Sequence, residues 1–214
     1  MLTALAVISA IAHIRAEYLG PAYHIYIFKP LTMVFILLIA LLTTKAVSAR
    51  YKILIVIGLL FSMAGDIFLM LPGDMFIAGL VSFLVAHIFY IAAFGAGHWR
   101  RFVWWSPLPF ALYGLLLVIL LAPSLGPMLA PVLVYIVVIM TMAWRAWERW
   151  LQTRRKDALL ALIGAILFAI SDSFLAFNKF QDPFLAARLL TLTTYFTAQW
   201  FIALSVYAHG RGRQ

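Results

Sequence analysis

The sequence has no cysteine and few charged residues. Without cysteine, disulfides, thiolate metal sites and cysteine nucleophiles are excluded. Charged residues make up 11% of the 214 positions and hydrophobic residues make up 66%, whereas soluble domains have about 25% and about 45–50%. With a mean hydropathy of +1.05, the composition indicates an integral membrane protein, most of whose chain lies in or near the bilayer.

A signal-peptide pattern and long polar segments are also missing. The N-terminal stretch MLTALAVISA has no basic n-region and no convincing cleavage site, so we expect it to form the first membrane span. No polar tail or linker is long enough for a soluble domain. We therefore expect a single transmembrane domain over residues 1–214.

The net charge of +9 comes from bases in short connections between apolar stretches, above all residues 98–105 (HWRRFVWW) and 145–157. This pattern is typical of membrane topology and anionic headgroups, and nucleic-acid binding is not expected. One side of the bundle would carry Lys45, Arg50, Lys52, Arg100, Arg101, Arg145, Arg149, Arg154, Arg155, Lys156, Arg211 and Arg213. The other side has little beyond Lys29, Lys179 and Arg188. The positive-inside rule then predicts that both termini are cytosolic.

Apolar stretches of about 20 residues predict an all-α integral membrane fold with eight transmembrane helices. We expect these at residues 2–18, 26–44, 53–71, 76–97, 107–121, 128–147, 158–177 and 184–208, with turns at 72–74 and 123–127. The first is the weakest, because His13, Arg15 and Glu17 interrupt it; without it seven spans would remain. Pro30 is expected in the first turn of the second helix, where proline is tolerated.

Two of these apolar stretches contain a carboxylate: GLLFSMAGDIFLML contains Asp66, and GAILFAISDSFLAF contains Asp172. Burying a lone charge in hydrocarbon costs several kcal/mol, so an intramembrane acid indicates a functional site. Counted from the cytosolic ends of their helices, both acids lie about 20 Å deep at 1.5 Å per residue. In a hydrocarbon core of about 30 Å this depth is the outer third. His87 is expected near the midplane.

The two acidic stretches also form a weak internal repeat. The first has the pattern Gly58-x7-Asp66-x-Phe68-Leu69, and the second has Gly164-x7-Asp172-x-Phe174-Leu175. They are the third and seventh of the expected spans. This predicts two parallel four-helix repeats related by an axis along the membrane normal, with both acids facing a shared interior.

Other polar residues have a simpler interpretation as contacts between helices. This applies to Ser62, Thr193, Thr194 and Gln199. For His87 the structural and the functional interpretation are equally open. No phosphate loop, zinc motif or serine-nucleophile elbow appears in the sequence, and no metal or organic cofactor is expected.

Four stretches share their pattern with a known family: YIFKPLTM, FSMAGDIFLML, HIFYIAAF and ISDSFLAFNKF. Through them the sequence resembles the YhhN family of membrane proteins, which includes animal lysoplasmalogenases. The resemblance implies eight spans and hydrolysis of the vinyl-ether bond of lysoplasmalogens, which releases a fatty aldehyde and glycerophospho-ethanolamine or -choline. The polar motif residues of the family fall on Lys29, Asp66, His87, Asp172, Asn178 and Lys179.

This chemistry suits two carboxyl groups. Vinyl-ether hydrolysis begins with a proton delivered to the alkene carbon, and water then captures the oxocarbenium ion; a protonated carboxyl group supplies the proton and an ionised one stabilises the cation or activates water. The hypothesis makes Asp172 the acid, Asp66 the base or stabiliser and His87 a residue that orients or shares the proton, and the reverse order of the two acids stays open. The predicted substrate-binding residues are Lys29, Asn178, Lys179, Tyr195 and Arg188, the three bases lying at the level of a lipid phosphate.

Two alternatives stay open at this point. A proton-coupled transporter or exporter would use the same intramembrane acids as proton carriers. A non-catalytic lipid-binding protein is the second alternative. In the first hypothesis the partner is a lysophospholipid that enters from the bilayer, and the composition fits a multi-pass protein of a bacterial inner membrane better than one of the endoplasmic reticulum.

Overall fold

The computed structural model describes residues 1–96, 103–181 and 183–209. Within these ranges the chain is helical, with the elements α1 (Leu2–Leu19), α2 (Tyr23–Leu41), α3 (Ala49–Met70), α4 (Phe76–Gly95), α5 (Leu108–Leu125), the 3-10 helix η1 (Gly126–Met128), α6 (Leu129–Thr153), α7 (Lys156–Phe180) and α8 (Ala187–Leu204). Six helical stretches of the described chain are long and apolar enough to cross a membrane. In this count Leu108–Thr153 is one stretch, and α8 is not included.

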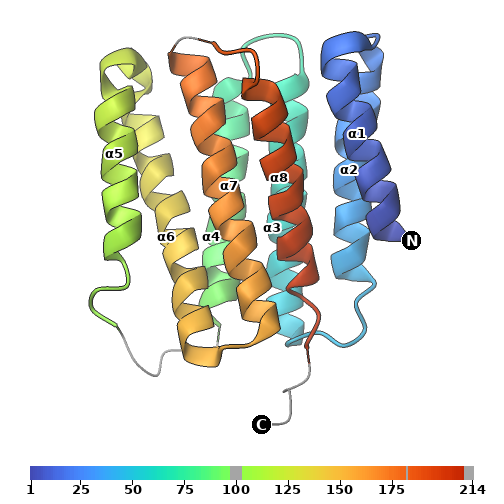
Figure 1. Cartoon of the computed structure of the whole chain (residues 1–214), viewed down its shortest axis with the longest axis vertical. Helices are drawn as coiled ribbons and strands as arrows, with labels where there is room; N and C mark the ends of the chain where they lie inside the picture. Colours follow the sequence, from blue (N-terminus) through green and yellow to red (C-terminus); the bar gives the residue numbers. More distant parts are fainter. Residues whose placement is uncertain (97–102, 182, 210–214) are drawn as a thin grey trace.

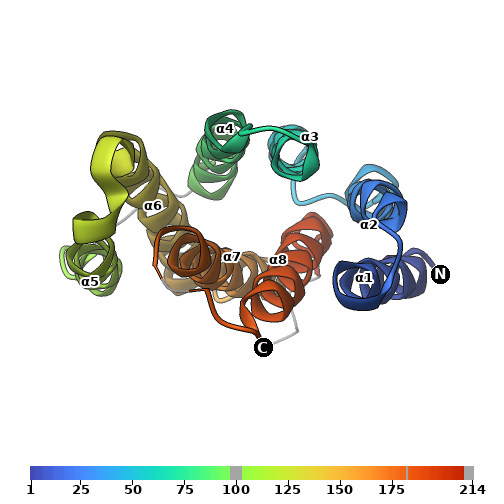
Figure 2. The ribbon, with the colours of Figure 1, turned by 90° about the horizontal axis from the view of Figure 1, so that it is seen from above.

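The helices run alternately up and down and form a ring (Figures 1 and 2). Contacts join α2, α3, α4, α6, α7 and α8 in this order, and α8 closes the ring against α2. α1 packs outside the ring against α2 and α8, and α5 packs outside it against α6 and α7. One face of each of the six ring helices therefore points to a common interior.

Short signals position α3 and its turn into α4. The Ser48 side chain accepts a hydrogen bond from the Tyr51 amide at 3.1 Å, which caps the first turn of α3. After α3 ends, Gly73 has a φ of +106°, a left-handed conformation that favours glycine. The expected turn at residues 72–74 therefore lies between the end of α3 at Met70 and the start of α4 at Phe76.

Two expectations about proline were wrong. α2 begins at Tyr23, so Pro30 lies inside the helix and not in its first turn. α5 likewise continues through Pro123 to Leu125, beyond its expected end at residue 121, and the chain turns at Gly126, with a φ of +47°, within the expected turn at residues 123–127. Membrane helices tolerate internal proline because side chains and neighbouring helices satisfy the freed backbone groups. Near Pro30, the hydroxyls of Ser9 and Thr32 both donate to the Phe28 carbonyl, at 3.1 and 2.7 Å.

The basic connection expected at residues 145–157 was also placed wrongly. α6 runs to Thr153, and only Arg154 and Arg155 separate it from α7. Arg149, 2% exposed, donates to Asp157 at 2.5 Å and to the Tyr51 hydroxyl at 2.9 Å. These side chains satisfy one another inside the bundle, so they are structural ion pairs and not headgroup contacts.

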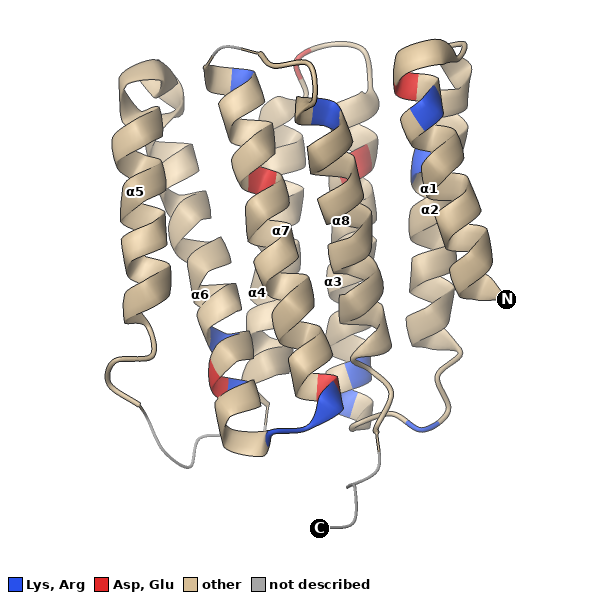
Figure 3. Cartoon of the chain, viewed as in Figure 1, with Lys and Arg blue, Asp and Glu red and all other residues tan. Residues whose placement is uncertain are grey.

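Other charged side chains lie towards the two ends of the bundle (Figure 3). One of these ends carries the α2–α3 and α6–α7 connections. Here Arg145 pairs with Glu148 at 2.8 Å, and Lys52 donates to the Leu41 and Thr43 carbonyls. Four of the expected basic residues, Arg100, Arg101, Arg211 and Arg213, lie outside the described residues, as does most of the 98–105 connection.

Gly58 and Gly164 allow the closest helix contacts on either side of the ring. A Cβ at Gly58 would lie 2.3 Å from the Tyr90 ring on α4, and a Cβ at Gly164 would lie 2.8 Å from the Ala198 carbonyl oxygen on α8. Glycine at these positions lets α3 pack tightly on α4 and α7 on α8, as small residues do in membrane helix pairs.

Candidate active site

A polar cavity of 420 Å³ opens inside the ring at the end where α3 turns into α4 and α7 turns into α8. Its wall contains charged and polar side chains from α1, α2, α3, α7 and α8, which are Glu17, Lys29, Asp66, Ser171, Asp172, Asn178, Lys179, Arg188, Thr191 and Tyr195, with Asp74 at the α3–α4 turn. The Gly73–Phe76 segment and the apolar side chains Phe68, Leu69 and Phe83 complete it. The third and seventh helices thus bring their acids to one cavity.

Asp66 is the buried acid of the pair, 2% exposed. One carboxylate oxygen lies 3.1 Å from the Lys29 ammonium, and the other accepts a hydrogen bond of 2.5 Å from the Tyr195 hydroxyl. Lys29 is itself only 9% exposed. A buried charge needs a partner, so Lys29 and Asp66 stabilise each other as an ion pair between α2 and α3.

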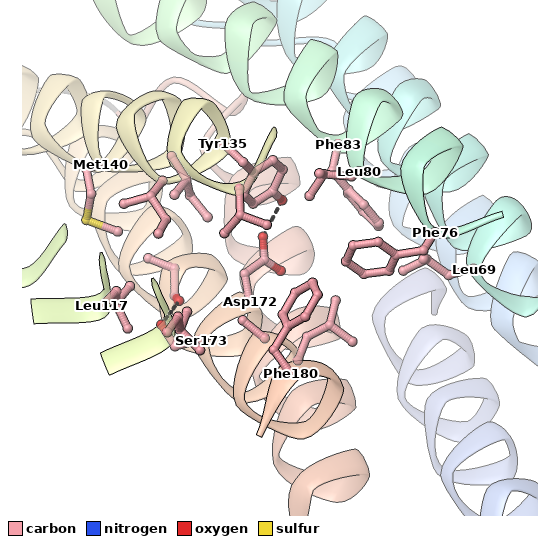
Figure 4. Close-up of a pocket in the computed structure, with 17 residues that line it drawn as sticks. Leu69, Phe76, Leu80, Phe83, Leu117, Tyr135, Met140, Asp172, Ser173 and Phe180 are labelled. Carbon is pink, nitrogen blue, oxygen red and sulfur yellow. Dashed lines mark hydrogen bonds between the residues drawn. The ribbon is translucent and has the colours of Figure 1, made fainter. Parts of the chain in front are cut away.

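Asp172 has different surroundings. It accepts a hydrogen bond from the Tyr135 hydroxyl of α6, and among the described residues no Lys or Arg forms an ion pair with it. Its carboxyl group lines the polar cavity and also a second, apolar cavity of 50 Å³ (Figure 4). This apolar cavity lies between α4, α5, α6 and α7 and is lined mainly by Leu, Ile, Met and Phe side chains. Asp172 therefore lies where a polar and an apolar chamber meet.

Aromatic rings form the floor beneath the acids. Phe83, Phe168 and Tyr195 contact one another edge to face, with centroid distances of 5.4–6.0 Å. His87 lies fully buried against this layer, 4.6 Å from the Phe168 ring centroid and 5.2 Å from that of Tyr135. Neither of its ring nitrogens has a hydrogen-bond partner among the described residues. His87 is thus close to the acid site without lining either cavity, and its catalytic role stays a prediction.

All five predicted substrate-binding residues line the polar cavity: Lys29, Asn178, Lys179, Arg188 and Tyr195. Two of them are held at its mouth. Arg188 donates to Glu17 at 3.0 Å, which ties α8 to α1, and the Lys179 ammonium lies 5.1 Å from the centroid of the Phe76 ring. The mouth therefore presents cationic groups at the end of the bundle, and the acids lie deeper.

Tyr135 was missed by the sequence analysis, although the repeat contains a signal for it. The two acids are 106 residues apart, and so are Lys29 and Tyr135. Lys29 contacts the first acid and Tyr135 the second. Extending the repeat from the acids to their neighbouring helices would have identified Tyr135 as the counterpart of Lys29.

Within the described ranges, no group of three or more His, Asp or Glu side chains is arranged to hold a metal ion. The chemical groups of the site are thus two carboxyls, two tyrosine hydroxyls and an ammonium. Such groups can donate, accept and stabilise protons and positive charge.

A helical bundle with apolar spans and charged side chains inside its ring is a multi-pass integral membrane protein with an intramembrane polar site. A family model described as the YhhN family matches residues 24–206, and the chain belongs to this family. The family resemblance seen in the sequence motifs is thereby confirmed.

Relatives of two kinds are similar to the chain. The protein named "Uncharacterized membrane protein YhhN" of Escherichia coli O6:H1 is 28% identical over 200 residues, which cover 94% of this chain and 95% of the relative. The lysoplasmalogenase TMEM86A of Homo sapiens is 37% identical over 162 residues, 71% of this chain and 64% of the relative. The lysoplasmalogenase TMEM86B of Sus scrofa is 36% identical over 159 residues, 70% and 61%. The chain thus spans less than two thirds of these two lysoplasmalogenases. No solved structure matches the chain.

Proposed function

We propose that the protein is a membrane hydrolase that cleaves the vinyl-ether bond of lysoplasmalogens, releasing a fatty aldehyde and glycerophospho-ethanolamine or -choline. The observation that carries the proposal is the pair of unequal acids in one cavity. Asp66 is ion-paired with Lys29, whereas Asp172 accepts a hydrogen bond from a tyrosine, has no ion pair with a Lys or Arg of the described residues and lines an apolar chamber. The named lysoplasmalogenase relatives support the same reaction.

Asp172 is the proton donor in this proposal. A carboxyl group without a cation beside it, at the edge of an apolar chamber, is the one of the two that carries a proton. It delivers this proton to the alkenyl carbon farther from the ether oxygen. The electron pair of the double bond forms the new C–H bond, and positive charge develops over the other alkenyl carbon and the oxygen. The Tyr135 hydroxyl stabilises the carboxylate that remains.

Asp66 then acts on water. Lys29 and the Tyr195 hydroxyl hold it as a carboxylate facing the same cavity as Asp172. Its negative charge stabilises the oxocarbenium ion, and it accepts a proton from the water that attacks the cationic carbon. The bond between the former alkenyl carbon and the glycerol oxygen of the resulting hemiacetal then breaks. Asp66 returns its proton to the glycerol oxygen and the hemiacetal hydroxyl gives its proton to Asp172, so that one water is consumed and both acids regain their starting states. The chemistry parallels that of the carboxyl pairs of glycosidases, which also handle an oxocarbenium-like transition state.

The cationic mouth of the cavity binds the phosphate of the headgroup. Lys179 lies on the last turn of α7, two turns beyond Asp172 on the same helix, and its side chain lines the cavity. Arg188 and Lys29 line the same cavity from α8 and α2. A phosphate held at this mouth leaves the ether bond of a lysolipid pointing inwards, towards the acids.

Replacing Lys179 by methionine should weaken phosphate binding without removing catalytic groups. We expect KM for lysoplasmenyl-ethanolamine to rise about 10-fold, as for one lost charge-assisted hydrogen bond, with kcat little changed. Steady-state aldehyde release measures both constants. Lys156→Met, at the opposite end of α7, is the matched control and should leave KM unchanged. An unchanged KM in K179M would remove Lys179 from the headgroup site.

We further propose the full topology of eight spans with cytosolic termini. The stretch Leu108–Thr153 has 46 residues, a helical length of about 69 Å, more than twice a hydrocarbon core. The break at Gly126 supports two antiparallel spans, α5 and α6. Lys45, Lys52, Arg154 and Arg155 gather at the end opposite the polar cavity (Figure 3). The positive-inside rule then makes this end cytosolic, so the cavity opens outwards, in a bacterial inner membrane if the source is bacterial.

The direct test is aldehyde release. Purified protein in detergent, given lysoplasmenyl-ethanolamine, should release fatty aldehyde and glycerophosphoethanolamine in equal amounts. A well-folded protein that releases neither would sink the hydrolase proposal for this substrate, and a second vinyl ether or a lysolipid would then be tried. A proton-dependent flux in liposomes in place of hydrolysis would favour the transporter. The aromatic floor and the buried Arg149–Asp157 pair, which fill the bundle below the cavity, support the hydrolase.

A further inference from the structure

The apolar cavity beside Asp172 is too small to hold a whole lipid chain. Its volume is 50 Å³, against 420 Å³ for the polar cavity. If the proposed hydrolysis is correct, the alkenyl bond lies against Asp172, and the rest of the chain must continue elsewhere. Two apolar grooves adjoin this cavity in the described part of the chain: one between α5 and α6 shares Ile136 and Met140 with it, and one beneath α5 shares Met140 and Ala169. Ala169 is one helical turn from Asp172, so we take the groove beneath α5 as the continuation.

That continuation is a groove of 360 Å³ beneath α5. We call it the α5 groove, and its lining residues are Pro109, Phe110, Tyr113, Met140, Ala143, Trp147, Ile166, Ala169 and Ile170. It is almost wholly apolar, and Ile166 at its edge is 38% exposed on the outside of the bundle. The groove therefore faces the hydrocarbon of the membrane.

Met140 and Ala169 line both the apolar cavity and the α5 groove. They form the wall between the two spaces, together with Tyr113, whose hydroxyl pairs with that of Ser173 at 2.9 Å. Ala169 is one helical turn from Asp172 on α7, and Met140 is on the facing side, on α6 (Figure 4). The wall between the acid site and the lipid-facing groove thus consists of a methionine, which is flexible and adapts its shape, an alanine methyl and the Tyr113–Ser173 hydroxyl pair.

We propose that the hydrocarbon chain of the substrate passes between Met140 and Ala169 into the α5 groove, and that this constriction governs which chains the site accepts. The inference rests on the proposed function for the identity of the substrate. The chain would then run from Asp172 towards the cytosolic half of the bundle, along α6 from Tyr135 to Trp147, a path of about 18 Å at 1.5 Å per residue. The headgroup stays at the polar mouth, so the lipid is threaded through the ring and not bound on its surface.

Filling the constriction tests the path. In Ala169→Phe, kcat/KM for a hexadecenyl lysoplasmalogen should fall about 10-fold or more, whereas kcat/KM for a butenyl analogue, whose chain ends before the constriction, should fall less than about 3-fold. The matched control is Ala10→Phe, in the groove formed by α1, α2 and α8, which shares no lining residue with the apolar cavity or the α5 groove; it should affect neither substrate. Equal losses for long and short chains in A169F would overturn the proposal. A loss for the long chain in Ala111→Phe, in the groove between α5 and α6, without a loss in A169F would also overturn the proposal.

A second measurement uses the unaltered protein and does not depend on how a variant folds. A lysophospholipid with a diazirine at the end of its chain should cross-link to the α5 groove, at Phe110, Ile166 or Ile170, and excess unlabelled lysolipid should prevent this. Cross-links that fall instead on the groove formed by α1, α2 and α8, around Ala10 and Phe196, would overturn the path. If the α5 groove is labelled, unlabelled lysolipid prevents this and no aldehyde is released, the path stands and the hydrolase is rejected. If aldehyde is released but A169F lowers kcat/KM equally for long and short chains, the hydrolase stands and the path is rejected.

Discussion

Asp172→Asn is expected to lower kcat for aldehyde release by about 100-fold or more, because a positioned general acid contributes about 10²–10⁴-fold. Asparagine keeps the shape of the side chain and a partner for the Tyr135 hydroxyl, and it removes only the acidic proton. Because Asp172 pairs with no Lys or Arg among the described residues, the change leaves no buried cation there unpaired. The folded yield and the thermal stability of the variant should therefore equal those of the wild type.

A substitution on the outer side of α6 provides the control for D172N. Thr141→Val removes a polar group from the outer side of α6, where the hydroxyl donates to the Val137 carbonyl, and it should retain full activity. Retention of wild-type kcat by D172N would assign the proton to another group. Asp66→Asn should also abolish activity, but it leaves the buried Lys29 without its counter-ion. Its effect on stability must be measured in parallel, because breaking a buried pair from one side costs about 3–5 kcal/mol.

Asp157→Ala is expected to destabilise the bundle by about 3–5 kcal/mol, because it breaks a buried ion pair from one side. Asp157 is fully buried and accepts from Arg149 at 2.5 Å and from Arg155 at 2.8 Å. Without it, the buried Arg149 guanidinium keeps only the Tyr51 hydroxyl as a polar partner among the contacts described here. Reversible unfolding in mixed micelles by increasing sodium dodecyl sulfate measures the difference.

Arg155→Ala is the matched control for this pair. Its side chain is 37% exposed, so losing it should cost less than about 1 kcal/mol, as for other exposed ion pairs. The folded fraction of D157A should hydrolyse substrate at the wild-type rate, since Asp157 lies about 22 Å along α7 from Asp172. Similar losses of stability in both variants would contradict the assignment of Asp157 as the buried centre of the cluster.

The sequence predicted the membrane class and the positions of the helices because both depend on long runs of apolar residues. It also predicted that Asp66 and Asp172 mark a functional site, because burying a carboxylate in hydrocarbon is costly, and the repeat around them predicted that they face one interior, where both line the polar cavity. The matched spacing around each acid added that they occupy equivalent helices. These inferences need only the order of residues along one helix.

The remaining features depend on which helices are neighbours, and an apolar sequence carries little of that information. Lipid-facing and ring-facing side chains are both apolar, so the pattern does not reveal that α6 lies beside α7 with Tyr135 facing Asp172. Arg149 was read as part of a connection because a base near a helix end usually meets headgroups; its burial depends on Asp157, on the next helix. Pro30 and Pro123 lie within helices, which membrane helices tolerate and local propensity does not foresee.

The spacing of 106 residues that relates Asp66 to Asp172 also relates Lys29 to Tyr135. In two identical half-sites, each acid would face the same residue, and nothing would favour the protonation of one carboxyl group over the other. Lysine in one half and tyrosine in the other remove that equivalence. In the proposed mechanism, this difference between the halves makes Asp66 the charged group and Asp172 the proton donor, so that a pair of like residues becomes a site with a direction.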